Sequence, residues 1–414
     1  MLYIDPGTGS MLFTILIGVL GTGVYKFKDT AVKVRFFMSG GKTRNDDDQK
    51  QAYVIFSDHK RYWNVFEPIC DEFERRETEL VYMTASPDDP ALNKPYKYVS
   101  CEFIGEGNKA FATLNSLRAD IVLSTTPSLD VFYWKRSKHV KYYAHVAHAA
   151  SDMTLYRMFG IDFYDAILTS GDYHENQIRA LEKARNLPEK EIVKVGLPFL
   201  DEMRERYKEA GPVQNKKPVV LLAPSWGPSA IFSRFGSKII DELLKTEYDI
   251  IIRPHPQSFI SEKELIESLM RKYPQGDRIE GNRDNDNFEV LRRADIMISD
   301  FSGVMFDFCL VFDKPLIYTD VQFDASPYDA CWLEEEPWTF RVLPKLGLKL
   351  TDENMDDIGN LISRCLSETR YEQGRMEARQ ETWANIGESA ELVADYLIEK
   401  HRELETGTEQ RNIK

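Results

Sequence analysis

The sequence has few cysteines and no excess of basic residues. Its five cysteines are odd in number, widely spaced and without a Cys-x-x-Cys pair, so we expect neither a disulfide framework nor a structural zinc site. Lysine and arginine number 53 against 67 aspartates and glutamates, a formal net charge of −14. This acidic balance argues against nucleic acid as a partner, because a phosphate footprint needs a basic surface.

The apolar run at the N-terminus is short for a transmembrane helix. Residues 11–25 are uncharged, but these fifteen residues are fewer than the ~20 that a span needs, although uncharged residues from Pro6 onward would lengthen it. Asp5 precedes the run and six lysines and arginines follow it up to Arg44, which places the C-terminal side in the cytoplasm. We expect residues 1–48 to form a membrane anchor, spanning or interfacial, with a basic juxtamembrane segment. The alternative is a buried helix of the fold.

From residue 52 onward, strand-like and helix-like segments alternate, which indicates parallel sheets with crossover helices. A polar break at residues 210–218 separates two such series. We therefore expect an α/β fold with two Rossmann-like domains facing a cleft, residues 49–211 and 212–402, followed by a polar tail at 403–414. The expected strands are 52–57, 79–84, 98–104, 120–124, 140–146, 165–169, 192–195, 219–223, 248–252, 294–299 and 315–319. The expected helices include 62–76, 108–117, 173–184, 353–367 and 371–401.

Residues 294–308 read as a buried strand, a small polar turn with Asp300 at its start, and an apolar helix. Free backbone N–H groups and the positive end of the helix dipole would meet at Ser302 and Gly303, where a phosphate would bind without a metal. The alternative is an ordinary packing junction, since a strand, turn and helix recur in every α/β protein.

A second motif follows the strand at 248–252, where the sequence reads Arg253-Pro254-His255-Pro256. Each proline holds the residue before it extended, so Arg253 and His255 should point to the same side. An arginine and an imidazole beyond the carboxyl end of a parallel strand suit a phosphorylated ligand. The alternative is a rigid loop whose histidine binds backbone.

Three further features bear on metal binding and on buried charge. His145 and His148 form a His-x-x-His pair, but no third ligand is positioned and strand spacing would put the pair on opposite faces. Residues 284–286 read Asp-Asn-Asp, within a polar string typical of a solvated loop. We therefore expect no metal and no cofactor. Asp307 lies inside an apolar helix and should pair with another group, because an unpaired buried carboxylate is costly.

From about Tyr53 to Ser367 the sequence resembles the CDP-glycerol glycerophosphotransferase family, the teichoic-acid primases and polymerases of bacterial cell envelopes. Several motifs in the correct order carry this resemblance, which is far more specific than any single motif. They are Asp58 to Phe66, the block around His148, Gly196 to Asp201, Ala223 to Trp226, Arg253 to Pro256, and Asp300 to Gly303 with Phe306 to Phe308. The resemblance implies a glycosyltransferase-B fold, with an acceptor domain preceding a nucleotide-donor domain.

The resemblance also implies a reaction and roles for individual residues. Glycerol phosphate, or a related polyol phosphate, would move from a CDP-activated donor to the hydroxyl of a lipid-linked or polymer acceptor at the membrane surface, releasing CMP. His148 would be the catalytic base. His255 and Arg253 would face the diphosphate, and Ser302, Gly303 and Asp300 would complete the anion site. The protein would then lie at the cell membrane with its catalytic domains on the cytoplasmic side.

The sequence departs from the family pattern at two places. The family has Gly-Thr and then a lysine after the first histidine, whereas Ala149-Ala150-Ser151-Asp152 follow His148. The family turn commonly carries two serines, whereas this chain has Ser302 and Gly303. These departures leave two alternatives open: another nucleotide-sugar transferase or epimerase on the same fold, or a non-catalytic membrane-associated nucleotide-binding protein.

Overall fold

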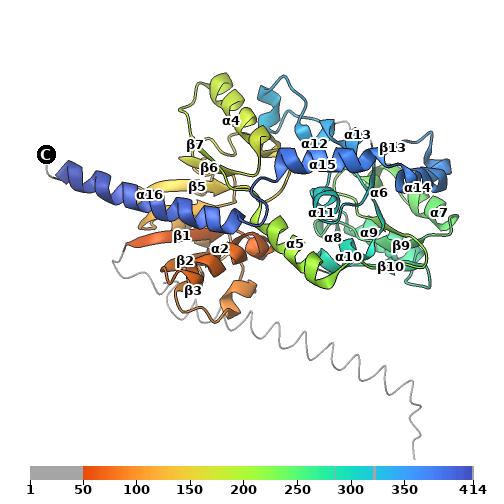
Figure 1. Cartoon of the computed structure of the whole chain (residues 1–414), viewed down its shortest axis with the longest axis horizontal. Helices are drawn as coiled ribbons and strands as arrows, with labels where there is room; N and C mark the ends of the chain where they lie inside the picture. Colours follow the sequence, from red (N-terminus) through yellow and green to blue (C-terminus); the bar gives the residue numbers. More distant parts are fainter. Residues whose placement is uncertain (1–49, 285, 320–322, 413–414) are drawn as a thin grey trace, which may run out of the picture. The chain divides into compact units, whose positions relative to one another are not determined.

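A computed structural model describes residues 50–284, 286–319 and 323–412. These residues form two β-sheets (Figure 1). The described residues divide into two compact units, one made of residues 50–143 together with residues 397–412, the other of the described residues within Ala144–Tyr396. The division falls inside a strand of the first sheet, and the whole of the second sheet belongs to the second unit.

The first sheet has seven strands in the order β3-β2-β1-β4-β5-β6-β7. Strands β2 and β4 are buried along their whole length, as expected for short apolar runs in a sheet covered on both faces. The strand bounds are β1 (Gln51–Ser57), β2 (Leu80–Thr84), β3 (Val99–Phe103), β4 (Ala119–Ser124), β5 (Val140–Val146), β6 (Ala166–Thr169) and β7 (Glu191–Lys194). The helices along this part of the chain are α2 (Trp63–Arg75), α3 (Asn108–Asn115), α4 (Asp172–Arg185) and α5 (Pro198–Ala210), with 3₁₀ turns η1 (Lys60–Tyr62), η2 (Pro90–Asn93) and η3 (Met153–Leu155).

The second sheet has six parallel strands in the order β10-β9-β8-β11-β12-β13. Its strands are β8 (Val219–Leu222), β9 (Asp249–Ile252), β10 (Ile279–Gly281), β11 (Ile296–Ser299), β12 (Leu316–Thr319) and β13 (Gly347–Leu350). The helices are α6 (Ile231–Phe235), α7 (Lys238–Leu244), α8 (Ser258–Ser261), α9 (Lys263–Lys272), α10 (Phe288–Arg293), α11 (Val304–Val311), α12 (Trp338–Arg341), α13 (Leu343–Leu346), α14 (Ile358–Ser367), α15 (Arg370–Thr382) and α16 (Ser389–Asn412), with 3₁₀ turns η4 (Asp329–Trp332) and η5 (Met355–Asp357).

Amphipathic helices cover the second sheet. Helix α14 buries Ile358, Leu361, Ile362 and Cys365, which share one face because they recur at helical spacing. These side chains join strand residues such as Ile298 in one apolar core. Helix α7 contributes to the same core and lies beside α14 (Figure 1). This packing fixes the strand ends on which the site is built.

The order of connection reverses between β8 and β11 in the second sheet. Ligands of open α/β sheets bind outside the carboxyl ends of the strands at such a switch point. The loops that follow β8 and β11 begin at Ala223 and Asp300. They therefore mark the expected position of a ligand, and the motif singled out at residues 294–308 lies there.

The predicted α/β class with two parallel sheets is confirmed. The predicted boundary between residues 211 and 212 lies between the last strand of the first sheet and the first strand of the second, and it stays a prediction. The expected anchor at residues 1–48 lies outside the described residues. Within the described ranges, no helix has the length and apolar character needed to cross a membrane.

The single helix expected over residues 371–401 is wrong, because the structure has two helices, α15 and α16, separated by a break. In the break, Asn385 and Gly387 have positive φ angles of 50° and 90°. The Ala384 N–H donates a hydrogen bond to the Ser170 carbonyl at 2.9 Å. This bond to a distant loop replaces the bond that a continuous helix would make.

Candidate functional site

Asp300 ties together the two loops at the switch point of the second sheet. Its buried carboxylate accepts hydrogen bonds from the N–H groups of Ser225 at 2.8 Å, Phe301 at 2.7 Å and Ile231 at 3.1 Å. Burial raises the pKa of Asp300 to about 6, and these bonds oppose that shift. Asp300 therefore holds the backbone of the site, and its predicted direct contact with a phosphate stays a prediction.

The turn after Asp300 leaves backbone N–H groups uncapped at the start of a helix, and its role as an anion site stays a prediction. Helix α11 begins at Val304 with Gly303 as its N-cap, and no side chain caps it. The N–H groups of Ser302, Gly303 and Val304 have no hydrogen-bond partner within the described residues. A Cβ built on Gly303 would meet no atom within 4 Å, so the space over the turn is open. Uncapped N–H groups at a helix N-terminus attract anions.

Arg253 and His255 follow β9, as the sequence predicted, but they have different partners. Arg253 is buried, and its guanidinium donates to Asn282 Oδ1 at 2.5 Å and to Asn287 Oδ1. It thus holds the loop before α10. His255 is partly exposed, and its Nδ1 accepts the Gln257 N–H at 3.1 Å. A neutral His255 must therefore carry its proton on Nε2, which makes that atom a hydrogen-bond donor.

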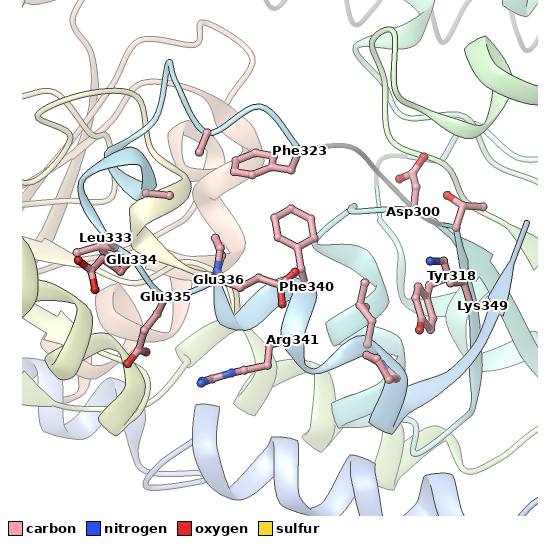
Figure 2. Close-up of a pocket in the computed structure, with 16 residues that line it drawn as sticks. Asp300, Tyr318, Phe323, Leu333, Glu334, Glu335, Glu336, Phe340, Arg341 and Lys349 are labelled. Atoms are coloured by element: carbon pink, nitrogen blue, oxygen red, sulfur yellow. The ribbon is translucent and has the colours of Figure 1, made fainter.

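A pocket of about 610 Å³ opens beside Asp300 at the carboxyl ends of β11 and β12. Figure 2 shows the rings of Phe323 and Phe340 in its middle, with Asp300, Tyr318 and Lys349 at one end. The two phenylalanine rings lie 4.9 Å apart. The other end is lined by Leu333, the acidic residues 334–336 and Arg341. Flat apolar rings with polar groups at both ends suit a nucleoside.

Sequence reasoning missed this pocket. Its far wall comes from residues 329–346, where a 3₁₀ turn and two four-residue helices follow one another. Elements this short have no periodic apolar pattern that could be read from the sequence. The available signal was compositional, since aromatic residues alternate with acidic ones between Tyr328 and Phe340.

His148 lies just beyond the end of β5 and forms part of a cluster with His145 and Tyr156. The Tyr156 hydroxyl lies 3.2 Å from His145 Nε2 and 3.3 Å from His148 Nδ1. The expectation that the two histidines occupy opposite faces is therefore wrong. That expectation assumed a continuous strand, whereas β5 ends at Val146. His148 therefore does not follow the alternation of side chains between the two faces of a strand.

The two histidines differ in burial. His145 is fully buried, and this burial lowers its pKa to about 3, with His148 and His174 lowering it further. His145 is thus neutral at physiological pH. His148 is partly exposed, as a base that meets a substrate must be.

The residues that depart from the family pattern after His148 have a structural use here. The carboxylate of Asp152 is buried and accepts the N–H groups of Trp338 at 2.8 Å and Thr339 at 2.7 Å. The Ser151 carbonyl lies 2.9 Å from Nε2 of the buried His174. This loop is therefore fixed to the start of α12 and to α4.

Among the described residues, no group of three or more histidine, cysteine or acidic side chains is arranged to hold a metal ion. Asp286 instead pairs with Arg206 at 2.5 Å and accepts the Phe288 N–H, and Asp284 accepts a hydrogen bond from Asn282. Asp307 was expected to pair with another group, and this is wrong for the part of the chain described: its carboxylate makes no hydrogen bond or ion pair there. Burial alone raises its pKa to about 7.

Solved structures share this fold over most of the chain. The wall teichoic acid polymerase TagF, in a crystal soaked with CDPG, is 15% identical, with 92% of this chain and 98% of that chain covered and a TM-score of 0.54. The UDP-GlcNAc 2-epimerase of Neisseria meningitidis, bound to UDP-GlcNAc, is 12% identical, with 85% and 100% covered and a TM-score of 0.56. Together with the two parallel sheets, these likenesses define an α/β protein of the glycosyltransferase-B type.

The family is shown by the sequence comparison. Residues 138–398 match the model of the CDP-glycerol:poly(glycerophosphate) glycerophosphotransferase family, and the chain belongs to this family. It is also 26% identical over 166 residues to the teichoic acid glycerol-phosphate primase of Bacillus subtilis (strain 168). That match covers 37% of this chain and 41% of the relative, so less than half of the relative's length is matched.

Proposed function

We propose that the protein transfers glycerol phosphate, or a related polyol phosphate, from a CDP-activated donor to an acceptor hydroxyl during synthesis of a teichoic-acid-like polymer, and releases CMP. The observation that carries this proposal is the family match over residues 138–398. The matched range contains both His148 and the open turn at Ser302 and Gly303, so it includes a candidate base and a candidate anion site.

The donor would bind at the switch point of the second sheet. The N–H groups of Ser302, Gly303 and Val304 would receive the diphosphate, and the Nε2–H of His255 would donate to it. Such donors stabilise the negative charge that collects on the departing CMP, because they are held in place before the reaction begins. The pocket beside Asp300, with Phe323 and Phe340, would take the nucleoside end of the donor.

At the acceptor end, His148 would remove the proton of the attacking hydroxyl. The acceptor oxygen forms a bond to the phosphorus that carries the glycerol, while the bond from that phosphorus to the CMP oxygen breaks. The proton passes to the imidazole and the bonding electrons leave with CMP. An imidazole suits this step since its ordinary pKa is near physiological pH.

We further propose that the protein works on the cytoplasmic side of the cell membrane on a lipid-linked or polymer acceptor, and that it needs no metal. The uncharged run at residues 11–25 and the lysines and arginines that follow it support the location. The uncapped N–H groups at the start of α11 support metal-free binding of phosphate.

The test is release of CMP from CDP-glycerol by the purified full chain with a lipid-linked or soluble glycerol-phosphate acceptor. We expect acceptor-dependent release that falls at least about a hundredfold in both His148→Ala and His255→Ala. His139→Ala, at an exposed histidine, is the matched control and should keep its activity. Turnover of UDP-sugars in place of CDP-glycerol would point to another nucleotide-sugar enzyme, and nucleotide binding without turnover of any donor would contradict catalysis.

A further inference from the structure

Tyr156 connects two histidines through a single hydroxyl group. Its Oη lies 3.2 Å from His145 Nε2 and 3.3 Å from His148 Nδ1. Its ring is stacked on the His148 imidazole, with the centroids 6.0 Å apart and an angle of 24° between the planes. The tyrosine follows His148 after the 3₁₀ turn Met153–Leu155, which returns the chain toward the end of β5.

The direction of these two hydrogen bonds decides what His148 can do. A phenol has one proton and its oxygen can accept two hydrogen bonds, so Tyr156 can donate to at most one of the two imidazoles. If His148 donates from Nδ1, its Nε2 is the basic atom. If His148 accepts at Nδ1, its proton lies on Nε2 and that atom can only donate.

His145 forms the fixed end of this chain of hydrogen bonds. It is fully buried, and its low pKa keeps it neutral. Its Nδ1 has no hydrogen-bond partner within the described residues, so the contact with Tyr156 is the polar contact that orients the ring. Because His145 is buried and neutral, it can fix the position of the Tyr156 hydroxyl without taking up a proton itself.

We propose that Tyr156 is a positioning residue that holds His148 in the tautomer whose Nε2 takes the proton of the acceptor hydroxyl. This inference rests on the proposed function and deepens its acceptor half. His148 Nδ1–H donates to Tyr156 Oη, and the Tyr156 hydroxyl donates to His145 Nε2. As the acceptor oxygen bonds to phosphorus, its proton moves to His148 Nε2, and the Nδ1–H of the imidazolium stays bound to Oη.

Other titratable groups face the same cluster. The centroid of the Tyr164 ring lies 5.0 Å from that of the His145 ring, and His174 helps to lower the pKa of His145. Tyr173 and Asp152 in turn lie beside His174. Any pH effect has to be compared with a variant that changes one of these neighbours and leaves Tyr156 in place.

The first test is Tyr156→Phe in the CMP-release assay, since this change keeps the ring and removes only the hydroxyl. We expect kcat to fall by about ten- to a hundredfold and KM for CDP-glycerol to change by less than about twofold. The acid limb of the kcat–pH profile should move to lower pH, because protonated His148 loses the oxygen that accepts its Nδ1–H. Tyr164→Phe is the control and should leave the acid limb unchanged.

The sign of the pH shift makes the proposal refutable. A shift to higher pH would mean that Tyr156 donates to His148, since removing a donor to the neutral imidazole favours its protonation. An unchanged acid limb with a lower kcat would mean a purely structural role. Either result overturns the assignment.

A second measurement does not depend on turnover. Nitrogen-15 NMR of the histidine side chains, with the His148 signals identified by their loss in His148→Ala, reports which ring nitrogen carries the proton. We expect Nδ1–H in the parent and a mixture of tautomers in Tyr156→Phe. An Nε2–H in the parent overturns the proposal, whereas an Nδ1–H without CMP release would sink the proposed function and leave the positioning role of Tyr156 intact.

Discussion

Asp152 and Thr339 bind each other reciprocally across 187 positions of the sequence. The Asp152 carboxylate accepts the Thr339 N–H at 2.7 Å, and the Asp152 N–H donates to the Thr339 hydroxyl at 3.3 Å. The carboxylate also accepts the Trp338 N–H. The pair fastens the loop after β5, which carries His148, to the first turn of α12, whose residues line the pocket beside Asp300.

Asp152→Asn should destabilise this attachment. The change turns one charged acceptor oxygen into an N–H₂ donor that faces N–H groups, at a cost of about 1–3 kcal/mol. We expect the melting temperature to fall by several degrees. Asp277→Asn, at an exposed aspartate, is the control. An equal melting temperature for parent and Asp152→Asn would show that the contact carries no stability.

Arg253→Lys should loosen the start of α10. A guanidinium reaches Asn282 and Asn287 at once, whereas an ammonium on a single stem does not reproduce that fork. We expect faster backbone hydrogen exchange in residues 286–293 and a free energy of unfolding that is lower by about 1–3 kcal/mol. Arg283→Lys changes an exposed arginine in the same loop and should leave exchange unaltered. Equal exchange in both variants would refute the role of Arg253.

Gly303 offers a matched pair of substitutions. Gly303→Ala should keep the affinity for CDP-glycerol, because φ is −56° and an added Cβ meets nothing. Gly303→Pro fits the same φ but removes the N–H. We expect it to raise KM for CDP-glycerol by about tenfold or more, the value of one charge-assisted hydrogen bond. Equal KM values would exclude this N–H from the anion site.

Asp307→Asn should change how stability depends on pH. The native pKa of Asp307 is raised to about 7, above the ordinary value of about 3.9. The folded chain therefore binds this proton more tightly than the unfolded chain does. The contribution of Asp307 to the free energy of unfolding falls as the pH rises from about 4 through 7. Between pH 5 and 8 the free energy of unfolding of the parent should fall by about 2–3 kcal/mol more than that of Asp307→Asn. Melting curves at both pH values measure the difference, with Asp277→Asn as the control.

Removal of divalent metal should leave the transfer reaction intact. If backbone N–H groups and His255 hold the diphosphate, as proposed, no cation is needed to neutralise it. We expect CMP release in EDTA to match that in magnesium within about twofold. Activity that is lost in EDTA and restored by magnesium would contradict the proposed metal-free site.

Most strands of the two sheets could be predicted from the sequence because they are short and apolar, but β10 and β13, at the two edges of the second sheet, were missed. The strand expected at 315–319 is β12 (Leu316–Thr319), and the one expected at 248–252 is β9 (Asp249–Ile252). The break between α15 and α16 was missed although Asn385 and Gly387 are residue types that end helices; the long-range bond from Ala384 to Ser170, which holds the break, could not be predicted. Contacts between residues so far apart leave no local pattern in the sequence.

The candidate site, too, could be predicted from the sequence only in part. The turn at Ser302 and Gly303 was predictable, because a strand, a polar turn and an apolar helix follow one another along the chain. The partners of Arg253 were not, since Asn282 and Asn287 lie 29 and 34 positions away. Tyr156 was missed too: it follows His148 by eight positions and reaches it only through an intervening 3₁₀ turn.

The hydrogen bond from the Gln257 N–H to His255 Nδ1 fixes the tautomer of the neutral His255 ring, so its Nε2 is a hydrogen-bond donor. The neutral ring carries its proton on Nε2, and the protonated ring keeps it there. A change of pH therefore alters the charge of His255 but never converts Nε2 from donor to acceptor. Protonation would instead break the bond to Gln257, because Nδ1 then carries a proton and can no longer accept one, so the ring would lose the contact that orients it while Nε2 stays a donor.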